Sequence, residues 1–103
     1  MKTRKELRSE LDNTDRRTRA LLDDLSEEQL DVPYHRGINP PIWELGHSAF
    51  FYEYFLLREL GRAAPRMPGY DEIWDSFEIQ HRNRWQKEVI PGRAATQDYY
   101  QRV

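Results

Sequence analysis

Three histidines are the side chains of this sequence best suited to binding a metal or moving a proton: His35, His47 and His81. The chain has no cysteine, so disulfides and thiolate chemistry are excluded. It contains no H-x-x-x-H or H-E-x-x-H pair, the spacings that place two ligands on one side of a helix. Because a metal site typically needs about three or four converging ligands, these residues predict at most part of a site.

His47 stands out because the residues around it are apolar, whereas His35 lies in a Pro/Gly-rich loop and His81 in the charged stretch QHRNR. On a helix drawn at about 100° per residue, His47 falls on a face that is mostly aromatic. Its neighbours on that face are Trp43, Phe50, Phe51 and Tyr54, with Glu44 and Arg58 close by. Such a histidine is either a hydrogen-bonded core residue or a metal ligand, and the pattern leaves both interpretations open. We expect the other two histidines to lie at the surface.

The segment that must position His47 is residues 39–60, NPPIWELGHSAFFYEYFLLREL. Asn39 is a favourable N-cap, Pro40 suits the first helical position and Gly61 suits the C-cap, so we predict a helix over almost the whole segment. A second apolar stripe runs along the side opposite the histidine: Ile42, Leu45, Ala49, Tyr52, Leu56 and Leu60. A helix that is apolar on two sides is typical of the centre of a bundle.

Helical patterns also appear before and after this segment. Leucines at three- and four-residue steps predict an amphipathic helix over residues 3–25, and Ser26 with Gln29 has capping-box spacing for a short following turn. The stretch DEIWDSFEIQHRNRW, residues 71–85, is predicted to be helical in part. Thr96 is predicted as the N-cap of a last helix that continues to the final residue.

These elements predict an all-α fold, an incomplete up-down helical bundle with two long helices, a short connecting helix and the start of a third. The 103 residues fit one domain at most. The last helix stops after about two turns, a length that is marginal without further packing. We therefore expect residues 1–103 to be the N-terminal part of a larger four-helix-bundle domain. A small three-helix domain with a short last helix is the alternative. Apolar helix faces left exposed on the chain would favour a dimer.

Composition excludes several classes of function. Lys and Arg number 16 against 18 Asp and Glu, a net charge of -2, which gives no basic surplus for nucleic acid. No apolar run approaches the roughly 20 residues that span a bilayer. The start, MKTRKELRSEL, lacks the apolar core of a secretory signal. We expect a soluble cytoplasmic protein with no nucleic-acid or membrane partner.

The segment around His47 also resembles a known family. NPPIWELGHSAFFYEYFLL is similar to the N-terminal DinB-like domain of the ergothioneine-type sulfoxide synthases and the related selenoneine synthases. That family has a proline-rich start, a Trp, a Gly-His or Ala-His pair, an aromatic pair, a Glu and a further aromatic residue. The matching positions here are Trp43, Gly46, His47, Phe50, Phe51, Glu53 and Phe55. The flanks LLDDLSEEQLDVPY and DEIWDSFEIQHRNRW resemble the family as well, so the likeness covers nearly the whole chain.

The resemblance implies that His47 is one of three histidines that bind non-haem iron(II). The other two come from an H-x-x-x-H pair on a later helix, beyond Val103. A lectin-like C-terminal domain supplies the catalytic tyrosine, so no catalytic residue is assigned within this chain. The implied reaction uses O₂ to join sulfur or selenium to the imidazole of hercynine, with a thiol or a selenium donor as second substrate.

Within that reading, an aromatic wall that includes Trp43, Phe51 and Tyr54 would keep the site dry, and Glu44 is a candidate to fix the tautomer of the histidine. One histidine cannot hold iron tightly, so the isolated chain is expected to be inactive and to bind no metal stably. Two alternatives stay open. One is another DinB-like, metal-dependent thiol transferase, and the other is a helical interaction module without chemistry.

Overall fold

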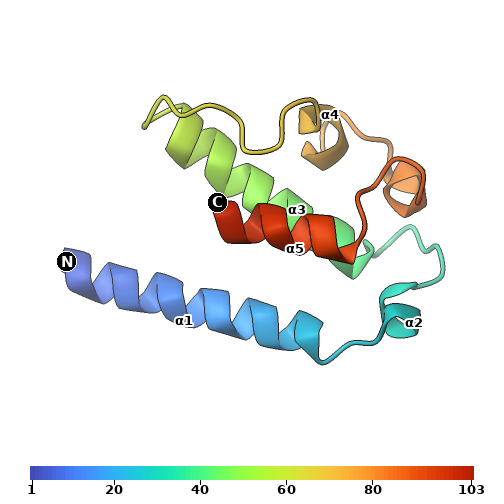
Figure 1. Cartoon of the computed structure of the whole chain (residues 1–103), viewed down its shortest axis with the longest axis horizontal. Coiled ribbons are helices and arrows are strands. Elements are labelled where there is room, and N and C mark those ends of the chain that lie inside the picture. The colour runs from blue at the N-terminus through green and yellow to red at the C-terminus, as the bar shows by residue number, and fades with distance from the viewer. The chain divides into compact units, whose positions relative to one another are not determined.

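The computed structural model describes all 103 residues and divides them into two compact units, residues 1–31 and 32–103, which are described separately. All regular secondary structure is helical and there is no strand (Figure 1). The prediction of an all-α fold is therefore confirmed. None of the helices combines the length and apolar character needed to cross a membrane.

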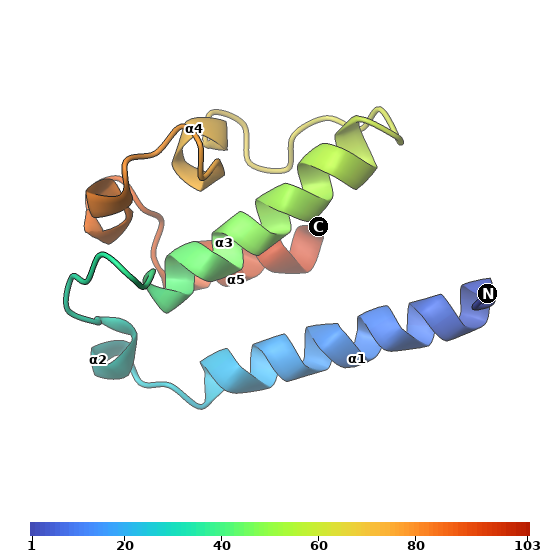
Figure 2. The ribbon, with the colours of Figure 1, turned by 180° about the vertical axis from the view of Figure 1, so that it is seen from behind.

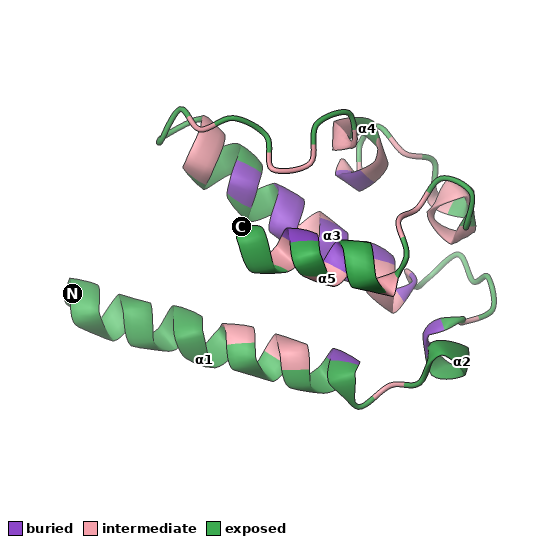
Figure 3. Cartoon of the chain, viewed as in Figure 1, coloured by how far each residue is buried: buried purple, intermediate pink, exposed green.

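The first unit holds helix α1, Arg4–Asp23, and the single turn α2, Glu27–Leu30. Both begin with a capping box, in which the N-cap hydroxyl accepts from a backbone N–H while the side chain three residues later accepts from the N-cap N–H. Ser26 and Gln29 form the second of these boxes, as their spacing predicts. Most of α1 is exposed to solvent (Figure 3).

The helix that carries His47 is α3, Pro41–Tyr52, and it continues into the π-helical turn η1, Glu53–Arg58. Asn39 is not its N-cap, contrary to prediction, because the extended Pro40 holds that position without a side-chain hydrogen bond. The side-chain amide of Asn39 instead donates to Glu44.

The end of this long helix also differs from prediction. The backbone N–H of Gly61 donates to the carbonyl of Leu56, five residues back, so the wide turn continues past η1. The residue in the left-handed conformation is Arg62, with φ 54°, rather than Gly61. A Cβ on Gly61 would still lie 2.8 Å from the carbonyl oxygen of Leu57, so any residue other than glycine would require the backbone to shift there.

Three further elements complete the second unit: α4, Asp71–Trp74; the 3₁₀ turn η2, His81–Trp85; and α5, Arg93–Arg102. Thr96 was predicted to cap the last helix, and this is wrong, since α5 begins three residues earlier after an extended Gly92. Thr96 is buried within the helix, where its hydroxyl donates to the carbonyl of Pro91 at 3.1 Å. The Pro91–Gly92 pair interrupts helical structure, and the helix therefore begins directly after it.

The core of the second unit lies where α4 and α5 pack against α3 (Figures 1 and 2). Its buried members come from all three helices: Trp43, Ala49, Phe50, Trp74 and Tyr99. Two large rings, Trp74 and Tyr99, stack at 6.1 Å with their planes 13° apart. The side of α3 that carries Trp43, Ala49 and Phe50 is therefore the side that α4 and α5 cover.

The apolar stripe predicted opposite His47 is only partly buried. Leu45 and Ala49 are buried, whereas Tyr52, Leu56 and Leu60 are exposed. The prediction that the whole stripe forms core is thus wrong for the second half of the helix. The covered side of the helix lies between the two predicted apolar sides, so each of them is only partly buried.

Candidate functional site

Two contacts hold the imidazole ring of His47. Its Nδ1 lies 2.7 Å from the backbone carbonyl oxygen of Trp74, a hydrogen bond between α3 and the end of α4. Its ring stacks on the indole of Trp43, one helical turn earlier, with centroids 4.7 Å apart and planes 11° apart. One contact fixes the direction of a ring nitrogen and the other fixes the plane of the ring.

The hydrogen bond decides which nitrogen carries the proton. A carbonyl oxygen only accepts, so Nδ1 of His47 must donate, and in the neutral imidazole the lone pair then lies on Nε2. Metal-bound histidines are commonly oriented in this way, with one nitrogen donating to a carbonyl and the other bound to the metal. His47 is thus a half-buried, hydrogen-bonded residue, and the lone pair on its Nε2 suits it to act as a ligand.

The C-terminal end of α4 supplies the hydrogen-bond acceptors for Trp43 and His47. The last carbonyls of any helix lack partners within it and must be satisfied from outside. Trp43 donates its indole N–H to the carbonyl of Ile73 at 2.8 Å, and His47 donates to the next carbonyl along. Because Trp43 and His47 stand four residues apart, they lie on one side of α3 and together cap α4.

Gly46 allows this close approach of α4 to α3. A Cβ at this position would lie 2.2 to 2.5 Å from three atoms of the six-membered ring of Trp74. Real Cβ atoms do not approach ring carbons so closely, so any side chain would push the indole away. The glycine next to the histidine therefore has a packing reason: it lets Trp74 lie across the helix with its carbonyl at His47.

Glu44 does not fix the tautomer of His47, contrary to the expectation, because the Trp74 carbonyl occupies Nδ1. The Glu44 carboxylate accepts from Asn39 at 2.5 Å instead. Asn39 also accepts from Arg84, whose guanidinium lies 4.1 Å above the Trp43 ring. Burial lowers the pKa of Arg84, and the Glu44 carboxylate opposes that shift.

In the predicted aromatic wall, Trp43 stacks directly on the His47 ring. Phe51 is 54% exposed and pairs with Phe55 at 4.7 Å, and Tyr54 is 37% exposed and contacts Phe50 and the same Phe55. These rings form a cluster along the second half of the helix. Both rings are thus more exposed than the buried Trp43, and they pair with other rings of the helix.

The other two histidines belong to a different cluster. Nε2 of His81 donates to the backbone carbonyl of His35 at 2.9 Å, and the His81 ring packs edge-on against Tyr34 and Trp85. These contacts tie the loop before α3 to η2. The chain brings together no group of three His, Asp or Glu side chains suited to a metal ion.

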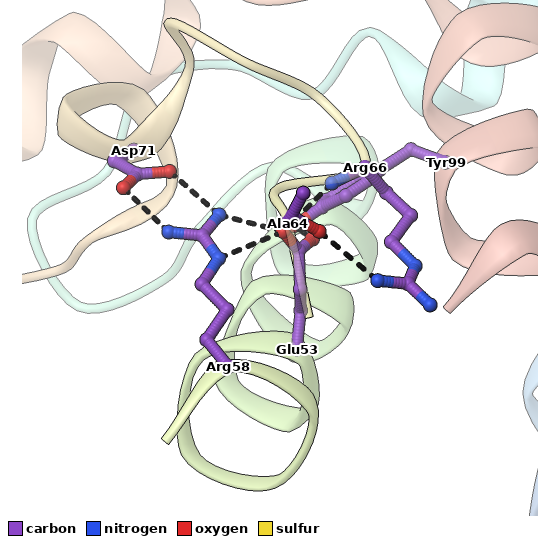
Figure 4. A network of polar contacts seen from close by, with 6 residues as sticks. All are labelled: Glu53, Arg58, Ala64, Arg66, Asp71 and Tyr99. Carbon is purple, nitrogen blue, oxygen red and sulfur yellow. Dashed lines mark hydrogen bonds and ion pairs between the residues drawn. The ribbon is translucent and has the colours of Figure 1, made fainter. Parts of the chain in front are cut away.

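A second polar centre lies deeper in the unit, around Glu53 (Figure 4). Its side chain is 0% exposed, and its carboxylate accepts from Arg58 at 2.6 Å, from the backbone N–H of Arg66 at 2.9 Å and from the hydroxyl of Tyr99 at 2.5 Å. Arg58 also makes a two-bonded pair with Asp71, at 2.7 and 2.9 Å. Every oxygen of the buried carboxylate is therefore satisfied, as burial of a charge requires.

The π-helical turn makes this arrangement possible. In a turn with hydrogen bonds to the fifth residue, residues five apart lie on nearly the same side, so Arg58 returns over Glu53. The hydrogen bonds of Arg58 to Asp71 and then to Glu53 raise the pKa of the arginine despite burial. Burial raises the pKa of Tyr99, and its bond to Glu53 raises it further. The network links the helix, the following loop, α4 and α5, and we assign it a structural role.

A family model for the DinB superfamily matches residues 10–103, nearly the whole chain. The chain belongs to the DinB superfamily. DinB domains are helical and often bind a divalent metal. No curated protein matches the sequence.

The residues of this DinB chain fit one ligand of a metal site. A neutral imidazole nitrogen is a good donor for iron, zinc, nickel or copper, and His47 holds Nε2 in the protonation state that ligation needs. The remaining ligands of such a site are not gathered within these residues. The agreement with a metal site is therefore limited to His47 and to the residues that support its ring, which contact it or contact Trp43.

Sequence reasoning missed two of those supports, Trp74 and Arg84. Trp74 acts through its backbone carbonyl, and no side-chain pattern indicates a backbone acceptor. Arg84 lies in a charged stretch that is typical of solvent-exposed surface. Glu53 did carry a signal, since it falls in line with Trp43, Gly46 and Phe50 on the apolar side of the helix, where an acid requires a partner.

Proposed function

We propose that this DinB chain contributes His47 as one ligand of a non-haem iron(II) site. The enzyme that contains this site would use O₂ to join sulfur or selenium to the imidazole of hercynine, with a thiol or a selenium compound as second substrate. The observation that supports the proposal best is the held imidazole of His47, with Nδ1 bonded to a carbonyl and the lone pair on Nε2. The motif from Trp43 to Phe55, which resembles the sulfoxide and selenoneine synthases, favours this member of the superfamily over others.

The chain's own residues would prepare the ligand before any metal arrives. The Trp74 carbonyl keeps the proton on Nδ1, so ligation does not require a change of tautomer. The Trp43 ring limits rotation of the imidazole about its bonds and excludes water from one face. Bound iron(II) would supply open positions at which O₂ and the sulfur or selenium donor meet. A ligand held in place loses less conformational freedom on binding, which increases affinity.

The rest of the site must come from other residues. We propose that residues 1–103 form the N-terminal part of a four-helix DinB bundle, and that a later helix with an H-x-x-x-H pair completes the set of three histidines. A further lectin-like domain would supply the catalytic tyrosine. A reading frame that continues past Val103 into such a helix supports this arrangement, and a stop codon directly after Val103 contradicts it.

A second candidate is a DinB thiol transferase that uses zinc or nickel, because the same imidazole nitrogen suits those metals. The interaction-module alternative takes its support from the exposed aromatic cluster on the second half of the helix, which a second copy could cover.

The test uses the complete gene product, loaded with iron(II) without oxygen and then exposed to O₂ with hercynine and a panel of thiol and selenium donors. Mass spectrometry that detects a C–S or C–Se product, and loss of that product in His47→Ala but not in His81→Ala, supports the proposal. Transfer of a thiol to an electrophile with zinc or nickel, and no O₂ consumption, would instead identify the second candidate.

A further inference from the structure

Arg84 contacts both structures that hold His47. Its guanidinium lies 4.1 Å above the ring of Trp43, the ring on which the imidazole stacks. Its Nη2 donates to the carbonyl of Ser76 at 3.1 Å, two residues after the carbonyl that accepts from His47. One side chain therefore reaches the aromatic support of the imidazole and the chain segment that supplies its hydrogen-bond acceptor.

The position of Arg84 is itself fixed. Nη1 donates to the side-chain oxygen of Asn39 at 2.9 Å, just before α3 begins. Nε is buried without a hydrogen-bond partner, so the flat guanidinium gives up one of its donors to lie against the indole. A planar guanidinium stacks on an aromatic face in a way that a lysine ammonium does not. This geometry is specific to arginine.

The effect expected of this arrangement concerns the tautomer. If Trp43 tilts or the segment after α4 moves away, the bond from Nδ1 to the Trp74 carbonyl lengthens and the proton can shift to Nε2, the nitrogen needed for a metal. We propose that Arg84 is a positioning residue for His47, acting through Trp43 and the Ser76 segment to keep Nε2 unprotonated. This inference rests on the proposed role of His47 as a ligand.

The experiment measures the tautomer of His47 directly, without metal, by long-range ¹H–¹⁵N correlation spectra of the ¹⁵N-labelled chain at about pH 8, where an ordinary histidine with a pKa of about 6.5 is neutral. The wild-type chain should show a single tautomer, protonated at Nδ1. Arg84→Lys keeps the charge but removes the planar stack, and it should give a mixture of tautomers. Arg82→Lys is the matched control, because Arg82 also lies over a ring, Tyr34 at 5.8 Å, in the same turn. It should leave His47 unchanged.

The indole N–H resonance of Trp43 reports whether the packing survives, since it depends on the bond to Ile73. If Arg84→Lys loses that resonance, Asn39→Ala decides the question. It removes the anchor of Nη1 and the bond from Asn39 to Glu44 but leaves the Arg84 side chain in place, and it should give a smaller tautomer shift in the same direction. A pure Nδ1–H tautomer in the folded variant, Arg84→Lys or in that case Asn39→Ala, overturns the positioning role. Titration of the wild-type chain with Co(II) separates the ligand role of His47 from the positioning role of Arg84. Equal broadening of all three histidines would remove support for a metal at His47, whereas a changed tautomer would still establish the role of Arg84.

Discussion

Gly46→Ala is the substitution whose cost can be worked most directly from the structure. The new Cβ would lie 2.2 to 2.5 Å from three ring atoms of Trp74, so the indole must move by about 1 Å or more to reach ordinary contact. Trp74 is 1% exposed and stacks against Tyr99, so a shift of its ring disturbs the packing of the core. Over-packing of a core costs about 3 kcal/mol at the upper end of its usual range.

Alanine also favours the helix over glycine by about 1 kcal/mol, which offsets part of that cost. The net expectation is a loss of about 2 kcal/mol in the free energy of unfolding, or roughly 10 °C in melting temperature for a unit of this size. Urea and thermal unfolding, followed by circular dichroism, measure this loss. The same substitution at Gly92, where a Cβ meets nothing within 4 Å, should cost no more than about 1 kcal/mol.

A double-mutant cycle tests the cause. Trp74→Phe removes the outer part of the indole together with a buried N–H that has no partner, so it leaves room for a Cβ at Gly46. In that background Gly46→Ala should cost less by about 1–2 kcal/mol. Gly46→Ala should also shift the tautomer equilibrium of His47, because the carbonyl of Trp74 moves when its ring is displaced. A Gly46→Ala chain as stable as the wild type, or a cycle with no coupling, would refute the reasoning.

Three further predictions follow from the polar contacts. Arg58→Met leaves the buried Glu53 carboxylate without its cation and should lower the free energy of unfolding by about 3 kcal/mol, whereas Arg19→Met, which breaks the exposed pair with Asp15, should change it by less than about 1 kcal/mol in the same urea titration. The raised pKa of Tyr99 means that the folded state keeps the phenol protonated while the unfolded state loses the proton above its ordinary pKa of about 10. Stability should therefore fall as the pH rises above about 10, and Tyr99→Phe should remove that slope although Tyr34→Phe should not; equal slopes in all three proteins would contradict the assignment. Tyr99→Phe should also cost about 1–3 kcal/mol at neutral pH, because one oxygen of the buried Glu53 loses its only donor, and a melt at wild-type temperature would argue against that bond.

The sequence predicted the helices well and their ends poorly. The spacing of apolar residues is a strong signal for an amphipathic helix, so the long helix that carries His47 was expected within a residue or so of its true start. The caps were harder, since Asn39 and Thr96 both have the right chemistry for an N-cap but are used otherwise. Asn39 is hydrogen-bonded to Glu44 and Arg84, and Thr96 is buried inside α5.

The candidate site was predicted in part for a similar reason. His47 and Trp43 share one face of a single helix, and periodicity alone brings them together. The acceptor for Nδ1 comes from a backbone carbonyl in α4, 27 residues later, and local pattern carries no information about such a contact. Glu44 seemed a natural acceptor because it is close in sequence, but its place on the helix directs it to Asn39.

The metal content of the complete protein tests the central claim most directly. Elemental analysis of the purified wild type should find about one iron per active site after anaerobic loading, and X-ray absorption should find imidazole nitrogens around it. His47→Ala should lose that iron while its circular dichroism spectrum stays helical, and His81→Ala should keep it. A folded His47→Ala protein with the full complement of iron would contradict the assignment of His47 as a ligand.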